Sequence, residues 1–361
     1  SSSIITGDSF AGEGGEIPMA ICGGTDLAAS PKPVNILLVV DKSSSMTDTP
    51  VGFGDTKWNG IRTALGTAID ATKGQVAFGL DFFPSSGSAS TALANVCQLP
   101  TSAAPTVPIA AGLATNSAIE KALADNAPAG ATPTAAALGR ALTYFKTGPG
   151  AALPGGHYVL LATDGGPNCD AALTCTAASC TTNMDGKMCG SPTANCCDPK
   201  LDPQGPSSCL DDAATIAAVA QLAKANVKTF VVGIPGTEAY QSTLDAVATA
   251  GGEPNPNAPP SFFSVSAAGG VKALSQVLTN IATGLITSCE LVLSADPPNY
   301  DQINVVIDGT TILEGSADGW TLDTTNKPPT VVLKGATCKA VETNGAQQLS
   351  ITFGCPTQHV K

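Results

Sequence analysis

The fold is decided by a short stretch, Val34-Asn35-Ile36-Leu37-Leu38-Val39-Val40, which runs directly into Asp41-Lys42-Ser43-Ser44-Ser45. The first part is apolar and β-branched, as is typical of a strand buried on both faces of a parallel sheet. The second part is polar and begins with an acid. We therefore predict a central strand that ends at Asp41 and presents polar side chains at its carboxyl end.

Helical and strand-like segments alternate after this stretch. Helices are expected near residues 57–71, 117–125, 134–145, 211–225, 240–250 and 270–285, and strands near 75–83, 158–163, 228–232 and 261–266. This alternation predicts an α/β fold with a doubly wound, mostly parallel sheet flanked by helices. The strand at 158–163 also ends on an acid, Asp164.

The chain is expected to have three parts. Residues 1–33 are rich in Gly, Ser and Pro and predict an irregular lead-in. Residues 34–285 hold the α/β domain, within which residues 165–210 form a disulfide-rich insertion that has no helical or strand period. Residues 286–361 alternate as short strands, with turns expected at Asp308-Gly309 and Asn344-Gly345, and predict a small β-sandwich-like domain.

Composition narrows the class of protein. A net charge of -12 repels nucleic acids and favours cations, so we expect no nucleic-acid partner. The 12 cysteines lack regular zinc spacing and indicate disulfides in an exported protein, whether extracellular, on the cell surface or periplasmic. No apolar run approaches the roughly 20 residues of a membrane span, and no signal peptide is seen. We expect a mature or trimmed form, and a lipid anchor upstream would lie outside this sequence.

Polar residues from three segments are expected to meet at one edge of the sheet. Ligands bind at the carboxyl ends of parallel strands, which is where Asp41 and Asp164 are placed. Ser43 and Ser45 follow Asp41 closely enough for their hydroxyls to converge with its carboxylate. A separate loop before a helix supplies Thr132, which the same spacing also predicts as a helix N-cap, and both roles can hold together. Oxygen ligands of this kind suit Mg²⁺, Mn²⁺ or Ca²⁺.

The motifs resemble one known family. Residues 41–45 resemble the Asp-x-Ser-x-Ser metal motif of von Willebrand factor type A and integrin inserted domains. Residues 130–134 resemble the threonine loop of that family, and residues 161–165 resemble its fourth-strand Thr-Asp-Gly. The resemblance covers roughly residues 34–285. It departs from the family in two ways, because Ser44 stands where bacterial relatives often have Gly and because the insertion follows Asp164 directly.

The resemblance implies a metal-ion-dependent adhesion site. Ser43 and Ser45 would bind the metal directly, Thr132 directly or through water, and Asp41 and Asp164 largely through water. Mg²⁺ is the expected ion, with Ca²⁺ or Mn²⁺ as alternatives. A metal held mainly by neutral hydroxyls stays electrophilic, so an Asp or Glu of a protein or extracellular matrix partner is expected to complete its octahedron.

The family topology also implies a cysteine layout. The insertion holds seven cysteines and needs an eighth, for which Cys97 is the candidate because its loop would lie at the same edge of the sheet. The remaining four are expected to pair among themselves and to fasten the lead-in and the β domain to the base of the sheet. They are Cys22, Cys289, Cys338 and Cys355.

We interpret the chain as an exported binding or adhesion protein, and the layout with its ending resembles exported bacterial proteins that have this domain, myxobacterial ones especially. An alternative is a structural or assembly subunit that holds its metal permanently and binds neighbours through the insertion or the β domain. An enzyme is not expected. A Ser-His-Asp site would require one of only two histidines, His157 and His359, and no Gly-x-x-x-x-Gly-Lys-Ser/Thr phosphate loop is present.

Overall fold

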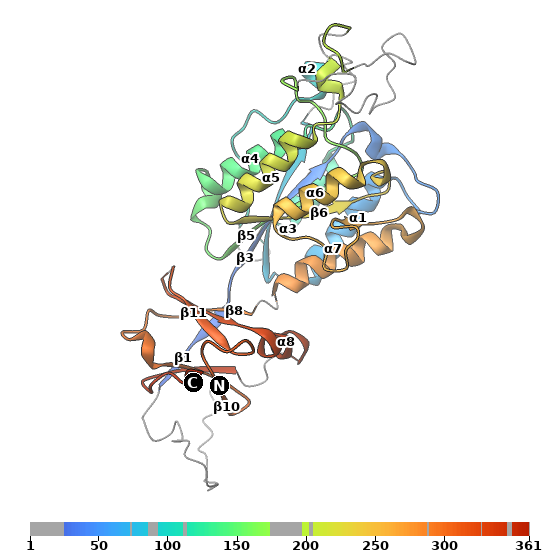
Figure 1. Cartoon of the computed structure of the whole chain (residues 1–361). Coiled ribbons are helices and arrows are strands. Elements are labelled where there is room, and N and C mark those ends of the chain that lie inside the picture. The colour runs from blue at the N-terminus through green and yellow to red at the C-terminus, as the bar shows by residue number, and fades with distance from the viewer. Residues whose placement is uncertain are drawn as a thin grey trace. The chain divides into compact units, whose positions relative to one another are not determined.

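The computed structural model describes residues 25–72, 74–85, 93–110, 114–173, 197–201, 205–286, 289–325, 327–344 and 349–360. These residues form two compact units (Figure 1). The larger unit is Pro33–Ile286. The smaller unit combines the described residues that precede and follow it in the chain.

The larger unit is built on one parallel sheet of five strands in the order β4-β3-β5-β6-β7. The central strand β3 begins at Val34 and ends at Asp41, as the sequence predicted. The strands are β3 (Val34–Asp41), β4 (Val76–Phe83), β5 (Gly156–Thr163), β6 (Val227–Gly233) and β7 (Phe263–Ser264). The predicted α/β class with a parallel sheet is confirmed.

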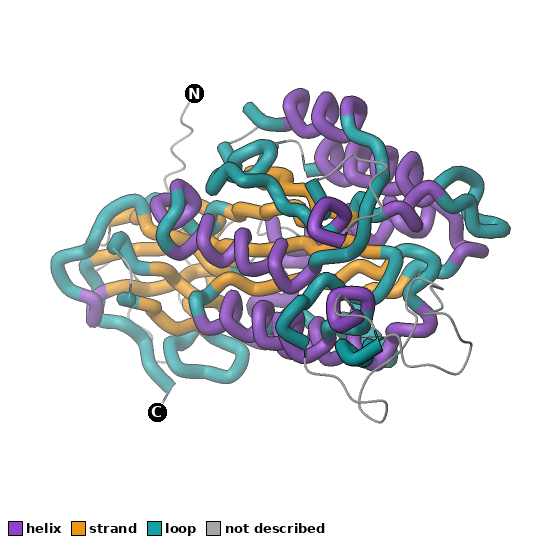
Figure 2. The backbone as a smooth tube through the Cα atoms, turned by 90° about the horizontal axis from the view of Figure 1, so that it is seen from above, coloured by secondary structure: helices purple, strands orange, loops and turns teal. Residues whose placement is uncertain are grey.

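Helices cover both faces of this sheet, so β3 is buried on each side (Figures 1 and 2). Ile36, Leu38 and Val40 point into one core, and Leu37 and Val39 point into the other. Each such side chain contributes about 1.5–3 kcal/mol when fully buried. The helices are α1 (Lys57–Ala71), α3 (Asn116–Asp125) and α7 (Gly270–Ile286) around the first core, and α4 (Thr134–Lys146), α5 (Asp212–Lys224) and α6 (Gln241–Gly251) around the second.

The strand order places a topological switch between β3 and β5. From β3 the chain passes through α1 to β4 on one side, and it later returns to β5 on the other side. Crevices at such switch points lie at the carboxyl ends of the strands. Asp41 ends β3 and Asp164 directly follows β5, so both carboxylates lie at this crevice.

The smaller unit consists of two antiparallel sheets, ordered β1-β13-β9-β10 and β11-β12-β8-β2. Its core surrounds Trp320, which is 1% exposed. Asp308 and Gly309 have positive φ and connect β9 to β10, which confirms the predicted turn. The elements are β1 (Thr25–Leu27), β2 (Ala29–Pro31), β8 (Glu290–Leu293), β9 (Ile303–Ile307), β10 (Thr310–Ile312), β11 (Trp320–Asp323), β12 (Thr330–Leu333), α8 (Gly335–Asn344) and β13 (Leu349–Phe353).

One local expectation for this unit was wrong, and another lies partly outside the described residues. The lead-in is not irregular throughout, because β1 pairs with β13 and β2 pairs with β8 as edge strands. Asn344 ends helix α8, whereas the sequence predicted a turn there, and its neighbour Gly345 lies outside the described residues.

The disulfides follow the predicted division. Cys97 is bonded to Cys169 of the insertion, and Cys197 is bonded to Cys209. Cys289 is bonded to Cys338 inside the core of the smaller unit, rather than fastening that unit to the base of the large sheet. Cys355 is also disulfide-bonded. The other cysteines of the prediction, Cys22, Cys175, Cys180, Cys189 and Cys196, lie outside the described residues.

Candidate metal centre

The loop after β3 is shaped by the last residue of that strand, Asp41. The backbone N–H of Ser43 donates to Asp41 Oδ1 at 2.7 Å, which folds the chain back over the end of the strand. A short 3-10 turn, η2 (Ser44–Thr47), follows, and its Met46 is fully buried in the core. The buried side chain of Met46 fixes the turn and leaves Ser45 exposed at the surface.

The two serine hydroxyls and the second aspartate are in contact. Ser43 Oγ lies 3.1 Å from Ser45 Oγ, and Ser45 Oγ donates to Asp164 Oδ1 at 3.0 Å. The other carboxylate, Asp41, is held by Thr163, whose hydroxyl donates to Asp41 Oδ2 at 2.7 Å. Four of the five predicted ligands are therefore brought together at the crevice.

The carboxyl groups of Asp41 and Asp164 are costly to ionise because they are buried. Asp41 and Asp164 are 0% and 2% exposed. Burial, together with the nearby charge of Asp164, raises the pKa of Asp41 from 3.8 to about 7. Burial also raises the pKa of Asp164, against the opposing effect of Lys57. Two buried carboxylates at one crevice are an environment that a cation stabilises.

A lysine that the sequence interpretation did not include lies at this crevice. Lys57 Nζ donates to Asp164 Oδ2 at 2.8 Å, and the side chain is 7% exposed. Lys57 is the first residue of α1, directly after the N-cap Thr56. A cation in the first turn opposes the helix dipole, and this is the one signal in the sequence that marks it as unusual.

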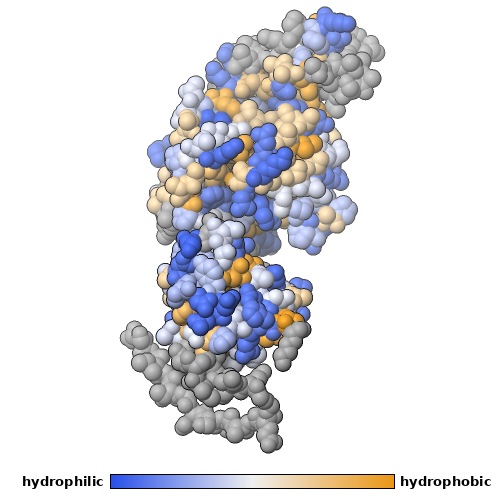
Figure 3. Space-filling model, turned by 60° about the vertical axis from the view of Figure 1, so that its left-hand side comes forward, coloured by the Kyte–Doolittle hydropathy of each residue, from blue (hydrophilic) through white to orange (hydrophobic). Residues whose placement is uncertain are grey.

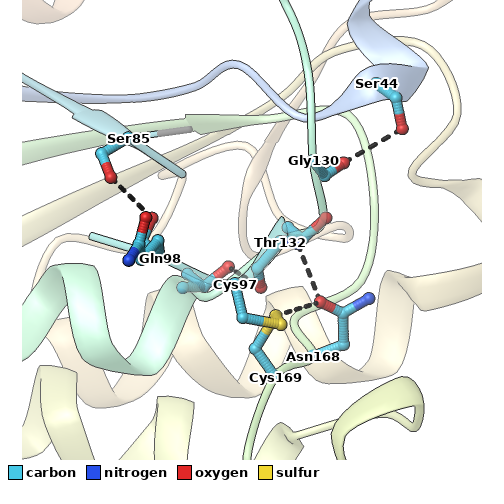
Figure 4. Close-up of a disulfide and its surroundings, with 9 residues drawn as sticks. Ser44, Ser85, Cys97, Gln98, Gly130, Thr132, Asn168 and Cys169 are labelled. Atoms are coloured by element: carbon cyan, nitrogen blue, oxygen red, sulfur yellow. Dashed lines mark hydrogen bonds between the residues drawn. A yellow bond between two sulfur atoms is a disulfide. The ribbon is translucent and has the colours of Figure 1, made fainter. Parts of the chain in front are cut away.

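The fifth predicted ligand, Thr132, is connected to the others through its loop. Gly130 O accepts hydrogen bonds from both the N–H and the hydroxyl of Ser44, each at 3.0 Å (Figure 4). Helix α4 begins at Thr134 with Pro133 at the cap position, and no side chain caps it. The expected capping role of Thr132 is therefore not observed.

Asn168 holds Thr132 in place from the insertion. Figure 4 shows its side chain directed at the threonine loop, beside the disulfide between Cys97 and Cys169. The N–H of Ala131 donates to Val96 O at 3.0 Å, so the segment before Cys97 supports the same loop. Asn168 could not be identified from the sequence, because the insertion has no periodic pattern that would place it.

The donors at the crevice fit a hard divalent cation. They are hydroxyl and carboxylate oxygens, which Mg²⁺ and Ca²⁺ prefer. Among the described residues, no group of three or more His, Cys, Asp or Glu is gathered for a metal. A cation here would accordingly depend on the hydroxyls of Ser43, Ser45 and Thr132 beside the two aspartates, and its chemistry would be that of a Lewis acid open to an anionic ligand.

Comparison with known proteins finds similarity in structure alone. No protein-family model and no curated protein matches the chain. Solved structures do match, and von Willebrand factor A domains are among them. One is the von Willebrand factor domain of Mfa5, a type V pili tip protein from Porphyromonas gingivalis. It has 13% identity and a TM-score of 0.41, with 71% of this chain and 97% of that one covered.

Two pilus proteins also match. The pilus adhesin SpaC from Lactobacillus rhamnosus GG has 15% identity and a TM-score of 0.47, with 91% of this chain and 40% of that chain covered. The PilB minor pilin from Streptococcus sanguinis has 16% identity and a TM-score of 0.44, with 71% and 62% covered. This chain therefore spans about two fifths of the adhesin and less than two thirds of the pilin.

Proposed function

We propose that this protein is an exported, non-enzymatic binding protein that holds a divalent cation, Mg²⁺ foremost, at Asp41, Ser43, Ser45, Thr132 and Asp164. The bound cation captures an acidic group on a protein or matrix partner. The observation that carries the proposal is the contact of Ser43 Oγ and Ser45 Oγ beside Asp164 Oδ1, at 3.1 and 3.0 Å. This geometry pairs neutral hydroxyls with a buried carboxylate at the switch point of the sheet.

Exposure supports binding at the surface. Ser45 is exposed while both aspartates are buried, so an incoming ligand would meet the hydroxyl side of the site first. Figure 3 shows hydrophilic residues interspersed with hydrophobic ones on the face in view. Among the described residues, large hydrophobic side chains are exposed at only four positions, Val51, Leu201, Leu313 and Val360. Recognition by charge is the mode that these features favour.

The disulfides agree with an exported protein. The disulfides between Cys97 and Cys169, and between Cys289 and Cys338, persist in oxidising compartments. Among the described helices, none is both long enough and apolar enough to cross a bilayer.

Calorimetric titration of Mg²⁺, Mn²⁺ and Ca²⁺ into chelator-stripped protein tests the proposal. The wild type should bind one ion, and the Ser43→Ala, Ser45→Ala double variant should lose binding. Ser44→Ala is the matched control, because its backbone N–H keeps the bond to Gly130. A glutamate-containing peptide should then bind only in the presence of metal. If metal raises the melting temperature and no acidic peptide binds, the assembly alternative is favoured.

A further inference from the structure

Lys57 is a buried cation in hydrogen-bond contact with one of the candidate metal ligands. Its ammonium lies 2.8 Å from Asp164 Oδ2 and 3.5 Å from Asp48 Oδ2. Asp48 is 65% exposed, so water screens that second contact, whereas the side chain of Asp164 is fully buried. The pairing with Asp164 is therefore the one that fixes the ammonium in place.

The carboxylate of Asp164 is divided between two partners. Oδ1 accepts the hydroxyl of Ser45 at 3.0 Å, on the side of the metal ligands. Oδ2 accepts the ammonium of Lys57 at 2.8 Å. The same side chain thus connects the hydroxyl pair to a fixed positive charge.

The surrounding backbone leaves room for this ammonium. Gly236 has φ +123°, a conformation that side chains rarely adopt. A Cβ at this position would lie 3.0 Å from Lys57 Nζ and 2.6 Å from Asp164 O. Any other residue at 236 would therefore press on both members of the pair.

The charge of Lys57 changes what a loaded site presents to solvent. The ionised side chains of Asp41 and Asp164 and the ammonium of Lys57 together carry one negative charge. A bound divalent cation changes this total to one positive charge. Without the ammonium the loaded group would be neutral. Charges this close and this buried interact strongly, because little water lies between them.

We propose that Lys57 sets the balance between metal affinity and ligand affinity at this site, an inference that rests on the proposed function. Its charge weakens the binding of the divalent cation. The same charge keeps the loaded site electropositive, which strengthens its attraction for an acidic partner. Lys57 is thus a specificity-determining residue that touches neither the metal nor the partner.

Lys57→Met and Lys57→Gln test the inference. Lys57→Gln removes the charge but can still donate a hydrogen bond to Asp164, so it serves as the test if the apolar variant folds poorly. Lys121→Met is the matched control, because it removes the same charge from an exposed lysine that pairs with Asp125 on α3. Calorimetry in full-length protein should show Mg²⁺ binding at least about tenfold tighter in both Lys57 variants and unchanged in the control. In saturating Mg²⁺, a fluorescent peptide with one central glutamate should bind them more weakly.

The outcomes distinguish a failure of the proposed role of Lys57 from a failure of the proposed function. If wild-type protein binds Mg²⁺ and folded Lys57 variants bind it equally or more weakly, the role of Lys57 is wrong and the proposed function stands. Equal peptide affinity in the variants and the wild type also overturns that role. If wild-type protein binds no divalent cation, the proposed function and the inference fail together.

Discussion

Asn168 and Thr132 are joined by a reciprocal pair of hydrogen bonds: Thr132 N–H donates to Asn168 Oδ1 at 2.8 Å, and Asn168 N–H donates to Thr132 O at 2.9 Å. The backbone of a predicted metal ligand is therefore fixed by the residue that precedes Cys169. Cys169 is bonded in turn to Cys97, 72 residues earlier in the chain. The position of Thr132 depends on a covalent link outside the sheet.

Removing that link should loosen the threonine loop. The Cys97→Ser, Cys169→Ser variant is expected to bind Mg²⁺ about tenfold more weakly, since small displacements of supporting groups cost about 10–100-fold in metal affinity. The Cys289→Ser, Cys338→Ser variant is the control. It should lose a comparable stability, about 2–5 kcal/mol, in chemical denaturation. Calorimetry that finds equal Mg²⁺ affinity in the two variants would contradict a positioning role for the disulfide at Cys97.

Metal binding should depend on pH through Asp41. Its pKa in the folded protein is raised to about 7, above its value in the unfolded chain, so between these two values the folded state holds a proton that the unfolded state releases. This residue therefore stabilises the metal-free protein more as the pH falls from about 7 towards about 4. Metal requires the ionised form, so Mg²⁺ affinity should fall by up to about tenfold per pH unit below about 7.

Titrations at about pH 8 and about pH 5.5 measure this dependence. The Asp41→Asn variant has no proton to release at this position and should show weaker Mg²⁺ binding with a shallower pH profile. A wild-type profile that stays flat over this range would show that metal binding does not displace a proton from Asp41.

Two threonines in neighbouring strands should respond oppositely to the same substitution. Thr163→Val removes the hydroxyl that donates to Asp41 Oδ2 at 2.7 Å, so it should cost about 1–3 kcal/mol and weaken Mg²⁺ binding near neutral pH. The buried hydroxyl of Thr229 on β6 has no hydrogen-bond partner among the described residues, so Thr229→Val should be neutral or stabilising. Chemical denaturation with and without Mg²⁺ compares them, and equal losses in both variants would refute this account.

Local sequence patterns predicted most of the larger unit, because each of its longer helices and strands has a recognisable pattern. The run from Val34 to Val40 is apolar on both faces, and the structure buries both faces. The helix expected at residues 57–71 has those same bounds as α1. Asp41 and Asp164 could be placed at one crevice because both follow such strands.

What the sequence did not reveal depends on contacts between distant segments. β1 and β2 have three residues each and form strands only because β13 and β8 offer unpaired edges far along the chain. Apart from its place in the first turn of a helix, nothing in the sequence distinguishes Lys57 until the fold brings Asp164 within 2.8 Å of it. Short strands and buried ion pairs of this kind have no periodic signal to detect.

The pairing of β2 with β8 also has a mechanical meaning. β2 ends just before the larger unit begins, and β8 starts just after it ends, so the antiparallel ladder between them clamps the two connections of that unit together. A force that separates Pro31 from Leu291 must therefore break this ladder before it can pull on the two ends of the α/β unit.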